Sequence, residues 1–595
     1  MANPPTDEAR LIVGVDYGTT FTGVAHGHTG SKTVDSIISI NSWPGLGNAN
    51  EVKAPSQIAY GSGEDFPHGF RWGYDIPQDR NLVRHVWVKL LLNSPSTANN
   101  GANMDADPTF ANKPALKPPS GYMALPPGKQ AIDVVADYLS GVYAHALDRL
   151  SQQYGREYVD VTPIDFVLTV PAIWSDKARN LTKEAAKRAG FASRPDDRIN
   201  LVTEPEAAAI YTIKSTFDAT RNANPLQIGD SFVMVDAGGG TVDLISYEVI
   251  QTEPELKIAE KVVGSGGNCG STFIDSQVQE LLRKRITLAK LGPIPLSKRG
   301  PGSKFMREFE TVKRAYGSGN GNPKPKYLTL NMPDNKIARI EDGDFELKDE
   351  EIKETFHPVI EEILTLVNGQ ITKIQEQGGK VKHIFLVGGF GESDYLYKTL
   401  QDYSWGNAGQ INVIRPASAW SAVARGAVLW GLQGDLLVDK RRCRRHYGTE
   451  LLKHFDPMMH SEVDAMISTF SGLKMAKNQI SWIINRGDNT DSNKRFRLSC
   501  VTSFNRGEKL IHTTQLVACD SDEAPMNLRD KEVYDLCLLT ADLSEVPERE
   551  FDECQIGSNT FLRAEFSIEM TFLPADIRFE TWFKGKCYGA VRTRY

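Results

Sequence analysis

Long apolar runs, cysteine frameworks and an excess of positive charge are all missing from this chain of 595 residues. No apolar stretch reaches the roughly 18–20 residues of a membrane-spanning helix, so we expect no membrane as a partner. Seven cysteines without a Cys-x-x-Cys pair disfavour a disulfide framework or a structural zinc site. A net charge of −7 gives no reason to expect nucleic acid as a partner. The polar segment before Leu11 leaves no room for a signal peptide, and these absences together predict a cytoplasmic protein.

Two common nucleotide-binding motifs are absent as well. The sequence contains no Gly-x-x-x-x-Gly-Lys-Ser/Thr loop and no complete Gly-x-Gly-x-x-Gly turn. A P-loop and a Rossmann site are therefore unsupported, and any phosphate site must use other glycine-rich turns.

Two such turns are present. Asp16-Tyr17-Gly18-Thr19-Thr20 and Asp236-Ala237-Gly238-Gly239-Gly240-Thr241-Val242-Asp243 each follow an apolar run and precede another extended segment. Glycine lets backbone N–H groups approach a bound anion, threonine hydroxyls add donors, and aspartates suit Mg²⁺ directly or through water. Because the turns are far apart in the sequence, we predict two lobes whose facing hairpins clasp a polyphosphate.

A third turn resembles a nucleotide contact. The apolar run Ile384–Val387 leads into Gly388-Gly389, and a helix is predicted from Ser393. A double glycine between a strand and a helix lets a ligand approach the backbone and the helix N-terminus. Together with the first two turns, it predicts a nucleotide site.

The first 430 residues or so alternate strand-like and helix-like segments, which is typical of an α/β fold. We predict helices at 131–154, 175–189 and 351–377, a surface insertion at 93–129 and a loop at 288–304. After Leu432, alternating apolar residues predict antiparallel β structure, for example along 496–504 and 562–572. The predicted domains are 1–433, a linker at 434–446 and a β-rich domain at 447–595.

The three turns resemble those of the 70-kDa heat-shock protein family, within the actin-like ATPase superfamily. Val170-Pro171-Ala172, Thr203–Tyr211 and Phe309–Arg314 resemble further segments of that family. The resemblance implies an actin-like ATPase domain of two ribonuclease-H-like lobes with ATP between them, followed by a sandwich-like β domain. Nothing after Phe572 resembles the family's helical lid, so we expect a divergent, lidless member.

The resemblance also implies roles for individual residues. The residues implied in catalysis are Lys89, Glu204, Asp236 and Asp16. Those implied in nucleotide binding are Gly18, Thr19, Thr20, Gly238, Gly239, Gly240, Thr241, Glu310, Lys313, Arg314, Gly388 and Gly389. Asp16, Asp236 and Asp243 would hold Mg²⁺ through water, and Pro171 and Arg179 would relay the nucleotide state to the second domain. For Lys89, an exposed lysine on a helix is the alternative interpretation.

The sequence departs from the family pattern in two places. Phe390-Gly391-Glu392 stands where the family has an arginine that stacks on adenine, which predicts weaker stacking unless Phe390 substitutes its own ring. The basic cluster Lys440–Arg445 is interpreted either as a solvated strand edge or linker or as a docking patch for an acidic partner.

These features favour an ATP-binding protein that hydrolyses ATP to ADP and phosphate with Mg²⁺. Its β domain would bind protein clients or one particular protein partner, with co-chaperones as further partners. A nucleotide-sensing module that does not hydrolyse ATP is the leading alternative. A small-molecule kinase is a third reading, although no sugar-recognition motif is visible.

Overall fold

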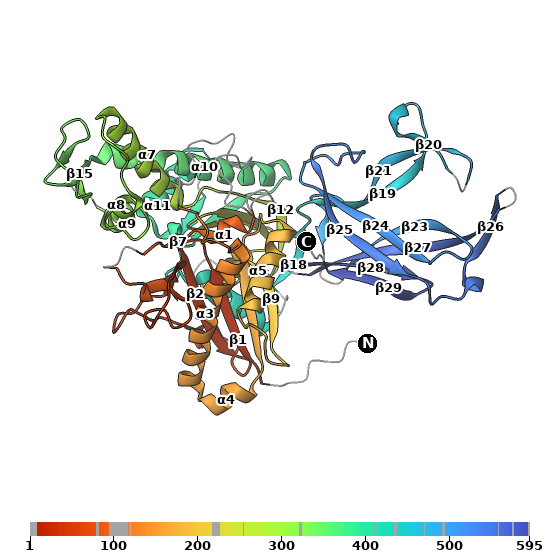
Figure 1. Ribbon diagram of the computed structural model, residues 1–595, viewed down its shortest axis with the longest axis horizontal. Coiled ribbons are helices and arrows are strands. Elements are labelled where there is room, and N and C mark those ends of the chain that lie inside the picture. Colours follow the sequence, from red (N-terminus) through yellow and green to blue (C-terminus); the bar gives the residue numbers. More distant parts are fainter. Residues whose placement is uncertain are drawn as a thin grey trace. The chain divides into compact units, whose positions relative to one another are not determined.

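The computed structural model describes residues 9–78, 82–93, 117, 122–216, 226–253, 255–319, 324–407, 411–433, 437–468, 471–490, 494–556, 559–573 and 576–592 (Figure 1). It contains two compact units. The first comprises Met1–Lys257 and Gly264–Leu437, and the second comprises Ile258–Val263 and Val438–Tyr595. Most of the predicted insertion at 93–129 lies outside the described residues, which include only 93, 117 and 122–129 of it. The domain division at 434–446 stays a prediction.

The first sheet of the first unit has the strand order β3-β2-β1-β8-β9. These strands are Ile38–Ser39, Phe21–His28, Leu11–Tyr17, Ile164–Val170 and Arg198–Thr203. β1 runs antiparallel to β2 and parallel to β8, which is parallel to β9. A short strand, β4 (Lys53–Pro55), also pairs with β2.

The second sheet repeats this topology. β11 (Val242–Gln251) pairs antiparallel with β10 (Ser231–Ala237), β16 (Val381–Val387) is parallel to β10, and β17 (Asn412–Ile414) is parallel to β16. The order β11-β10-β16-β17 matches β2-β1-β8-β9, and β12 (Lys257–Gly267) follows β11 in the sheet. The duplication confirms the α/β actin-like fold with two ribonuclease-H-like lobes.

Helices pack on these sheets. α12 (Ala422–Gln433) packs on β1 and on α6 (Glu204–Thr216), whereas α10 (Asp349–Glu376) packs on β10 and β11. The other helices are α1 (Val88–Leu91), α3 (Ala131–Tyr154), α4 (Arg156–Val161), α5 (Asp176–Arg188), α7 (Thr272–Leu288), α8 (Leu296–Arg299), α9 (Lys304–Ala315) and α11 (Asp394–Asn407). Among the described residues, no helix is long and apolar enough to cross a membrane.

The helix predictions are largely confirmed. Ser175 caps α5 by accepting a hydrogen bond from the backbone N–H of Ala178 at 3.2 Å. The loop predicted at 288–304 is wrong in part, because α8 forms within it and α9 begins at Lys304. Short strands complete the unit, namely β5 (Gln57–Tyr60), β6 (Phe70–Trp72), β7 (His85–Val86), β13 (Lys326–Thr329), β14 (Ile340–Glu341) and β15 (Asp344–Leu347).

The second unit is a β structure of two sheets, as the alternating pattern predicts. One sheet has the order β20-β21-β19-β24-β25, and the other has β23-β27-β28-β29 with β26 paired to β27. Residues that include Leu516, Leu562 and Phe579 form its apolar core. The strands are β18 (Val438–Arg442), β19 (His446–His454), β20 (Ala465–Ile467), β21 (Lys474–Ile484), β22 (Asn489–Thr490), β23 (Arg495–Asn505), β24 (Ile511–Cys519), β25 (Val533–Asp542), β26 (Asp552–Ile556), β27 (Asn559–Leu573), β28 (Asp576–Phe583) and β29 (Lys586–Arg592).

The basic cluster at 440–445 finds acidic partners inside the second unit. The backbone N–H of Arg442 donates to Glu260 Oε2 at 2.9 Å, and Arg444 Nη2 lies 3.1 Å from Glu260 Oε1. Arg445 Nε lies 2.7 Å from Asp520 Oδ1. The interpretations as a solvated strand edge or linker, or as an external docking patch, are therefore wrong for these three arginines. Arg444 and Arg445 form ion pairs within the second unit, and the Arg442 guanidinium donates to the backbone carbonyls of Glu260 and Gly487.

Candidate nucleotide site

The two predicted phosphate turns adopt the same local geometry. The N–H of Gly18 donates to the carbonyl of Phe21 at 3.1 Å, and the N–H of Gly238 donates to that of Thr241 at 3.0 Å. The turns also touch, since a Cβ added to Gly239 would collide with the hydroxyl of Thr20. The structure therefore brings together the two turns that the sequence places far apart.

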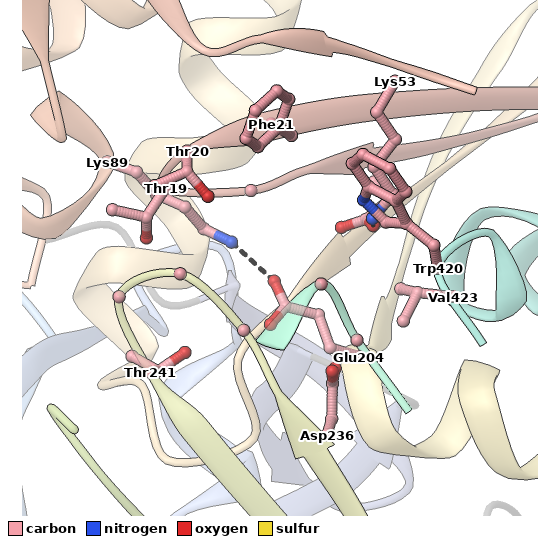
Figure 2. A pocket seen from close by; sticks show the side chains of 17 residues that line it. Thr19, Thr20, Phe21, Lys53, Lys89, Glu204, Asp236, Thr241, Trp420 and Val423 are labelled. Atoms are coloured by element: carbon pink, nitrogen blue, oxygen red, sulfur yellow. Dashed lines mark hydrogen bonds and ion pairs between the residues drawn. The ribbon is translucent and has the colours of Figure 1, made fainter. Parts of the chain in front are cut away.

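One pocket lies between the two turns (Figure 2). Its lining comes from both lobes and includes most residues predicted for phosphates, metal and catalysis. The lining residues are Asp16, Gly18, Thr19, Thr20, Phe21, Lys53, Lys89, Glu204, Asp236, Gly238, Gly239, Gly240, Thr241, Gly388, Gly389, Trp420 and Val423.

Gly388 brings the third turn onto the carboxylate of Asp236. Its φ is +86°, a conformation that L-residues rarely adopt, and a Cβ there would collide with Asp236 Oδ1. Its N–H donates to the carbonyl of Ala419 at 3.3 Å. The third turn is thereby held between the phosphate turn and the segment that carries Trp420.

Lys89 enters the pocket from a short, strained element. Trp87, immediately before α1, has a φ of 58°, which is unusual for a bulky residue and costs on the order of 1–3 kcal/mol. Lys89 is 3% exposed, and its Nζ lies 2.5 Å from Glu204 Oε1 (Figure 2). The same Nζ lies 5.3 Å from the ring centroid of Trp174. The alternative of an exposed lysine is therefore wrong.

Carboxylates crowd this end of the pocket. Burial raises the pKa of Glu204 to about 7, although the Lys89 ammonium opposes this rise. Burial and the neighbouring carboxylates Glu204, Asp16 and Asp243 raise the pKa of Asp236 well above its usual range. Among the described residues no three acidic, histidine or cysteine side chains form a group that could hold a metal ion, so this negative charge suits a divalent cation bound through water. Asp16 and Asp236 both line the pocket.

Asp243 connects the second phosphate turn to the predicted relay residues. Its Oδ1 accepts a hydrogen bond from the N–H of Ile173 at 3.1 Å, two residues after Pro171. Arg179 Nη2 donates to the carbonyl of Ala172 at 2.8 Å. The segment that follows Pro171 is thus linked to the turn by one hydrogen bond and Arg179 by two, and the relay role of both residues stays a prediction.

A second pocket continues from the first and contains the predicted adenosine residues on α9. Lys313 Nζ lies 2.8 Å from Asp275 Oδ1 and 2.7 Å from Glu310 Oε2. Burial opposes both charges, but the ion pairs dominate, so the pKa of Glu310 falls to about 2 and that of Lys313 rises to about 12. The lining residues are Thr20, Phe21, Gly239, Ser271, Glu310, Lys313, Arg314, Gly389, Phe390, Glu392, Ser393 and Trp420.

Comparison with known proteins identifies the family. The family model described as "Hsp70 protein" matches residues 136–434, which is half of the chain.

The chain belongs to the Hsp70 family.

Relatives support this assignment. "Heat shock 70 kDa protein 12A" of Homo sapiens is 26% identical over 520 residues, covering 75% of this chain and 72% of the relative. "Heat shock 70 kDa protein 12B" of Homo sapiens is 25% identical over 530 residues, covering 77% of this chain and 73% of the relative. "Chaperone protein HscA" of Proteus mirabilis is 31% identical over 288 residues, covering 47% of this chain and 39% of the relative. The chain is therefore an ATP-binding, Hsp70-like protein.

This Hsp70-family chain has an aromatic wall in its second pocket that sequence reasoning missed. The rings of Phe21 and Trp420 meet edge to face, with centroids 5.7 Å apart and an interplanar angle of 84°. Arg314 Cζ lies 5.3 Å from the Phe21 centroid and 5.2 Å from that of Trp420. The position of Phe21 directly after Thr19-Thr20 was a usable signal for its role. Trp420 gave no sequence signal, because only the fold brings its segment next to Phe21.

Phe390, the predicted substitute for the missing arginine, takes a different position. It is 5% exposed, and its ring centroid lies 6.3 Å from that of Phe356 on α10. It lines the second pocket, but its side chain belongs mainly to the apolar core. Lys53 is the other residue that the sequence did not reveal, and it contacts Asp16 directly.

Proposed function

We propose that this chain hydrolyses ATP to ADP and phosphate in the pocket between its two lobes, in the presence of Mg²⁺. The observation that carries the proposal is the buried Lys89–Glu204 ion pair at the wall of a pocket lined by two phosphate-binding turns. A purely structural ion pair would have no need to face such a pocket.

The residues suggest how the reaction would be assisted. Backbone N–H groups and hydroxyls of the two turns would hold the phosphate oxygens. The Lys89 ammonium would stabilise negative charge on the transferred phosphoryl group, and Glu204 would orient the attacking water and accept its proton. Mg²⁺ held near Asp236 would neutralise phosphate charge when bound.

The proposal is tested by single-turnover hydrolysis with the full chain in excess over radiolabelled ATP and with Mg²⁺ present. We expect labelled ADP to form. ATP that binds without ADP appearing would favour the non-hydrolysing module. Phosphorylation of an added sugar would favour a kinase. The control for lysine substitutions in the pocket is Lys284→Met on α7, which should hydrolyse ATP as the wild type does. The Lys284 side chain is 68% exposed and lies outside both pockets.

We further propose that the second unit binds apolar segments of protein clients. Five apolar side chains between β19 and β21, together with Leu452 on β19, are at least half exposed; the five are Met458, Met459, Val463, Ile467 and Leu473. Flexible methionines and aliphatic side chains in one connection suit partners of varied sequence.

Asp464 anchors this connection from within. Its side chain is fully buried and accepts hydrogen bonds from Asn478 at 2.8 Å and Asn527 at 2.9 Å. The exposed residues are therefore presented by a fixed framework.

Fluorescence anisotropy of a labelled apolar heptapeptide tests the client proposal. We expect Met458→Glu to weaken peptide binding, because a charge would replace a side chain that is 90% exposed. Leu538→Glu on β25, at 59% exposure, serves as the control and should bind normally. Equal binding by all three proteins would contradict the proposal. Nucleotide-dependent release of the peptide would test the predicted coupling through Pro171 and Arg179.

A further inference from the structure

Asp16, Gly23 and Lys53 lie in a row across three neighbouring strands. Asp16 on β1 pairs with Gly23 on β2, and Gly23 pairs with Lys53 on β4. Directly paired residues of an antiparallel pair place their side chains on the same face of the sheet. Lys53 must therefore cross the whole width of β2 to reach Asp16.

Gly23 provides the path for this crossing. A Cβ at Gly23 would lie 3.2 Å from both Cγ and Cε of Lys53, so any larger residue would press against the lysine stem. The Lys53 side chain is 6% exposed, and its Nζ ends 2.5 Å from Asp16 Oδ2. The missing side chain on β2 thus permits a buried ammonium at the floor of the pocket.

The chain itself occupies both oxygens of Asp16. Oδ2 faces Lys53, and Oδ1 accepts a hydrogen bond from the hydroxyl of Thr169 at 3.3 Å. Asp236 differs, because no ion-pair partner for it is found within the described part of the chain. Figure 2 shows Lys53 and Lys89 entering the pocket from opposite sides.

We propose that Lys53 is a tethered counter-ion of the phosphate site, which fills the place of a divalent cation beside Asp16 and lets the chain bind a nucleoside diphosphate without one. An ammonium has three N–H donors, so the group that holds Asp16 can also donate to a phosphate oxygen. Hydrolysis still uses Mg²⁺, whereas binding does not require it. The inference rests on the proposed nucleotide site.

Calorimetric titration of the full chain with ADP, in excess Mg²⁺ and in EDTA, tests the inference. We expect the wild-type affinities in the two buffers to differ by less than about tenfold. Lys53→Met should lose at least about tenfold in EDTA and regain affinity with Mg²⁺. Lys284→Met should behave as wild type.

The outcomes separate this inference from the proposed function. If the wild type binds ADP only with Mg²⁺, or if Lys53→Met shows the wild-type ratio, the counter-ion role is wrong while the nucleotide site stands. If the wild type binds ADP in neither buffer, both proposals fail.

Thermal unfolding with Mg²⁺ alone gives a second readout without nucleotide. We expect Mg²⁺ to raise the Tm of Lys53→Met, because it fills the vacated place beside Asp16, and to leave the wild type nearly unchanged. The double variant Asp16→Asn with Lys53→Met removes both charges, so it should fold even if the single variant does not, and its Tm should not respond to Mg²⁺. An equal rise of Tm in wild type and double variant would overturn the inference.

Discussion

Replacement of Trp420 by alanine is the perturbation that addresses the base end of the pocket. Trp420 lines both pockets and forms an edge-to-face pair with Phe21. If a base binds there, its face would lie against one of these rings. The indole is thus expected to contribute to nucleotide affinity without taking part in phosphate chemistry.

The size of the effect follows from two opposing contributions. Stacking of a base on an aromatic side chain is worth roughly 1–3 kcal/mol by alanine substitution. The Arg314 guanidinium, 5.2 Å from the indole in the free protein, must give up a contact of about 0.5–1 kcal/mol when the base enters. The net loss for Trp420→Ala is therefore about 1.3 kcal/mol from the midpoints of these ranges, or slightly under tenfold in ADP affinity.

Calorimetry with ADP and with pyrophosphate separates a base contact from a general disturbance. We expect Trp420→Ala to weaken ADP and spare pyrophosphate, and Trp420→Phe to recover most of the loss. Trp405→Ala on α11, at 79% exposure, is the matched control. Unchanged ADP affinity, or an equal loss for pyrophosphate, would refute the reasoning.

Two further predictions concern the catalytic carboxylate and the packing of α12. Because the pKa of Glu204 is about 7, and its ionised form is the one that orients water, single-turnover hydrolysis should rise from pH 6 to 8 with a midpoint near 7. Glu204→Gln should abolish that rise, and a pH profile that it leaves unchanged would exclude the role. A Cβ at Gly426 would collide with the backbone of Ala207 on α6, so Gly426→Ala should destabilise the fold by roughly 3 kcal/mol. Gly369→Ala in α10 meets open space and should stabilise it by about 1 kcal/mol, and equal urea midpoints for the two variants would contradict this packing argument.

The raised pKa of Glu204 also has a consequence for stability. An acid whose folded pKa lies above its ordinary value of 4.5 favours folding most below that value. This contribution is lost as the pH rises through about 7. The free energy of unfolding of the nucleotide-free protein should therefore fall as the pH rises from about 4.5 to about 7, and that of Glu204→Gln should fall less.

Local sequence patterns predicted the secondary structure well where apolar runs and turn or capping residues indicate the same element. The apolar runs before Asp16 and Asp236 became β1 and β10, and Ser175 capped α5 as expected. These features depend on neighbours in sequence, which a single chain displays. The topology of the two lobes came from the family resemblance, because strand order depends on contacts distant in sequence.

The sequence motifs predicted the glycine-rich turns of the site. They did not predict the pocket residues that come from segments distant in the sequence. Lys89 gave a weak signal, because nothing local shows that a four-residue helix after a strained Trp87 is buried. Lys53 gave none, since it lies two strands away from Asp16 and reaches it only across Gly23 on the strand between them. The basic run 440–445 was misread because Glu260 and Asp520 lie far from it in sequence.

Single-turnover hydrolysis by Lys89→Met tests the central claim most directly. The ammonium of Lys89 pairs with Glu204 at 2.5 Å and faces the phosphate turns, so its loss should remove stabilisation of the transferred phosphoryl group. The variant should still bind ATP but form ADP at least about a hundredfold more slowly than wild type. An unchanged rate of ADP formation would show that Lys89 does not stabilise the transferred phosphoryl group.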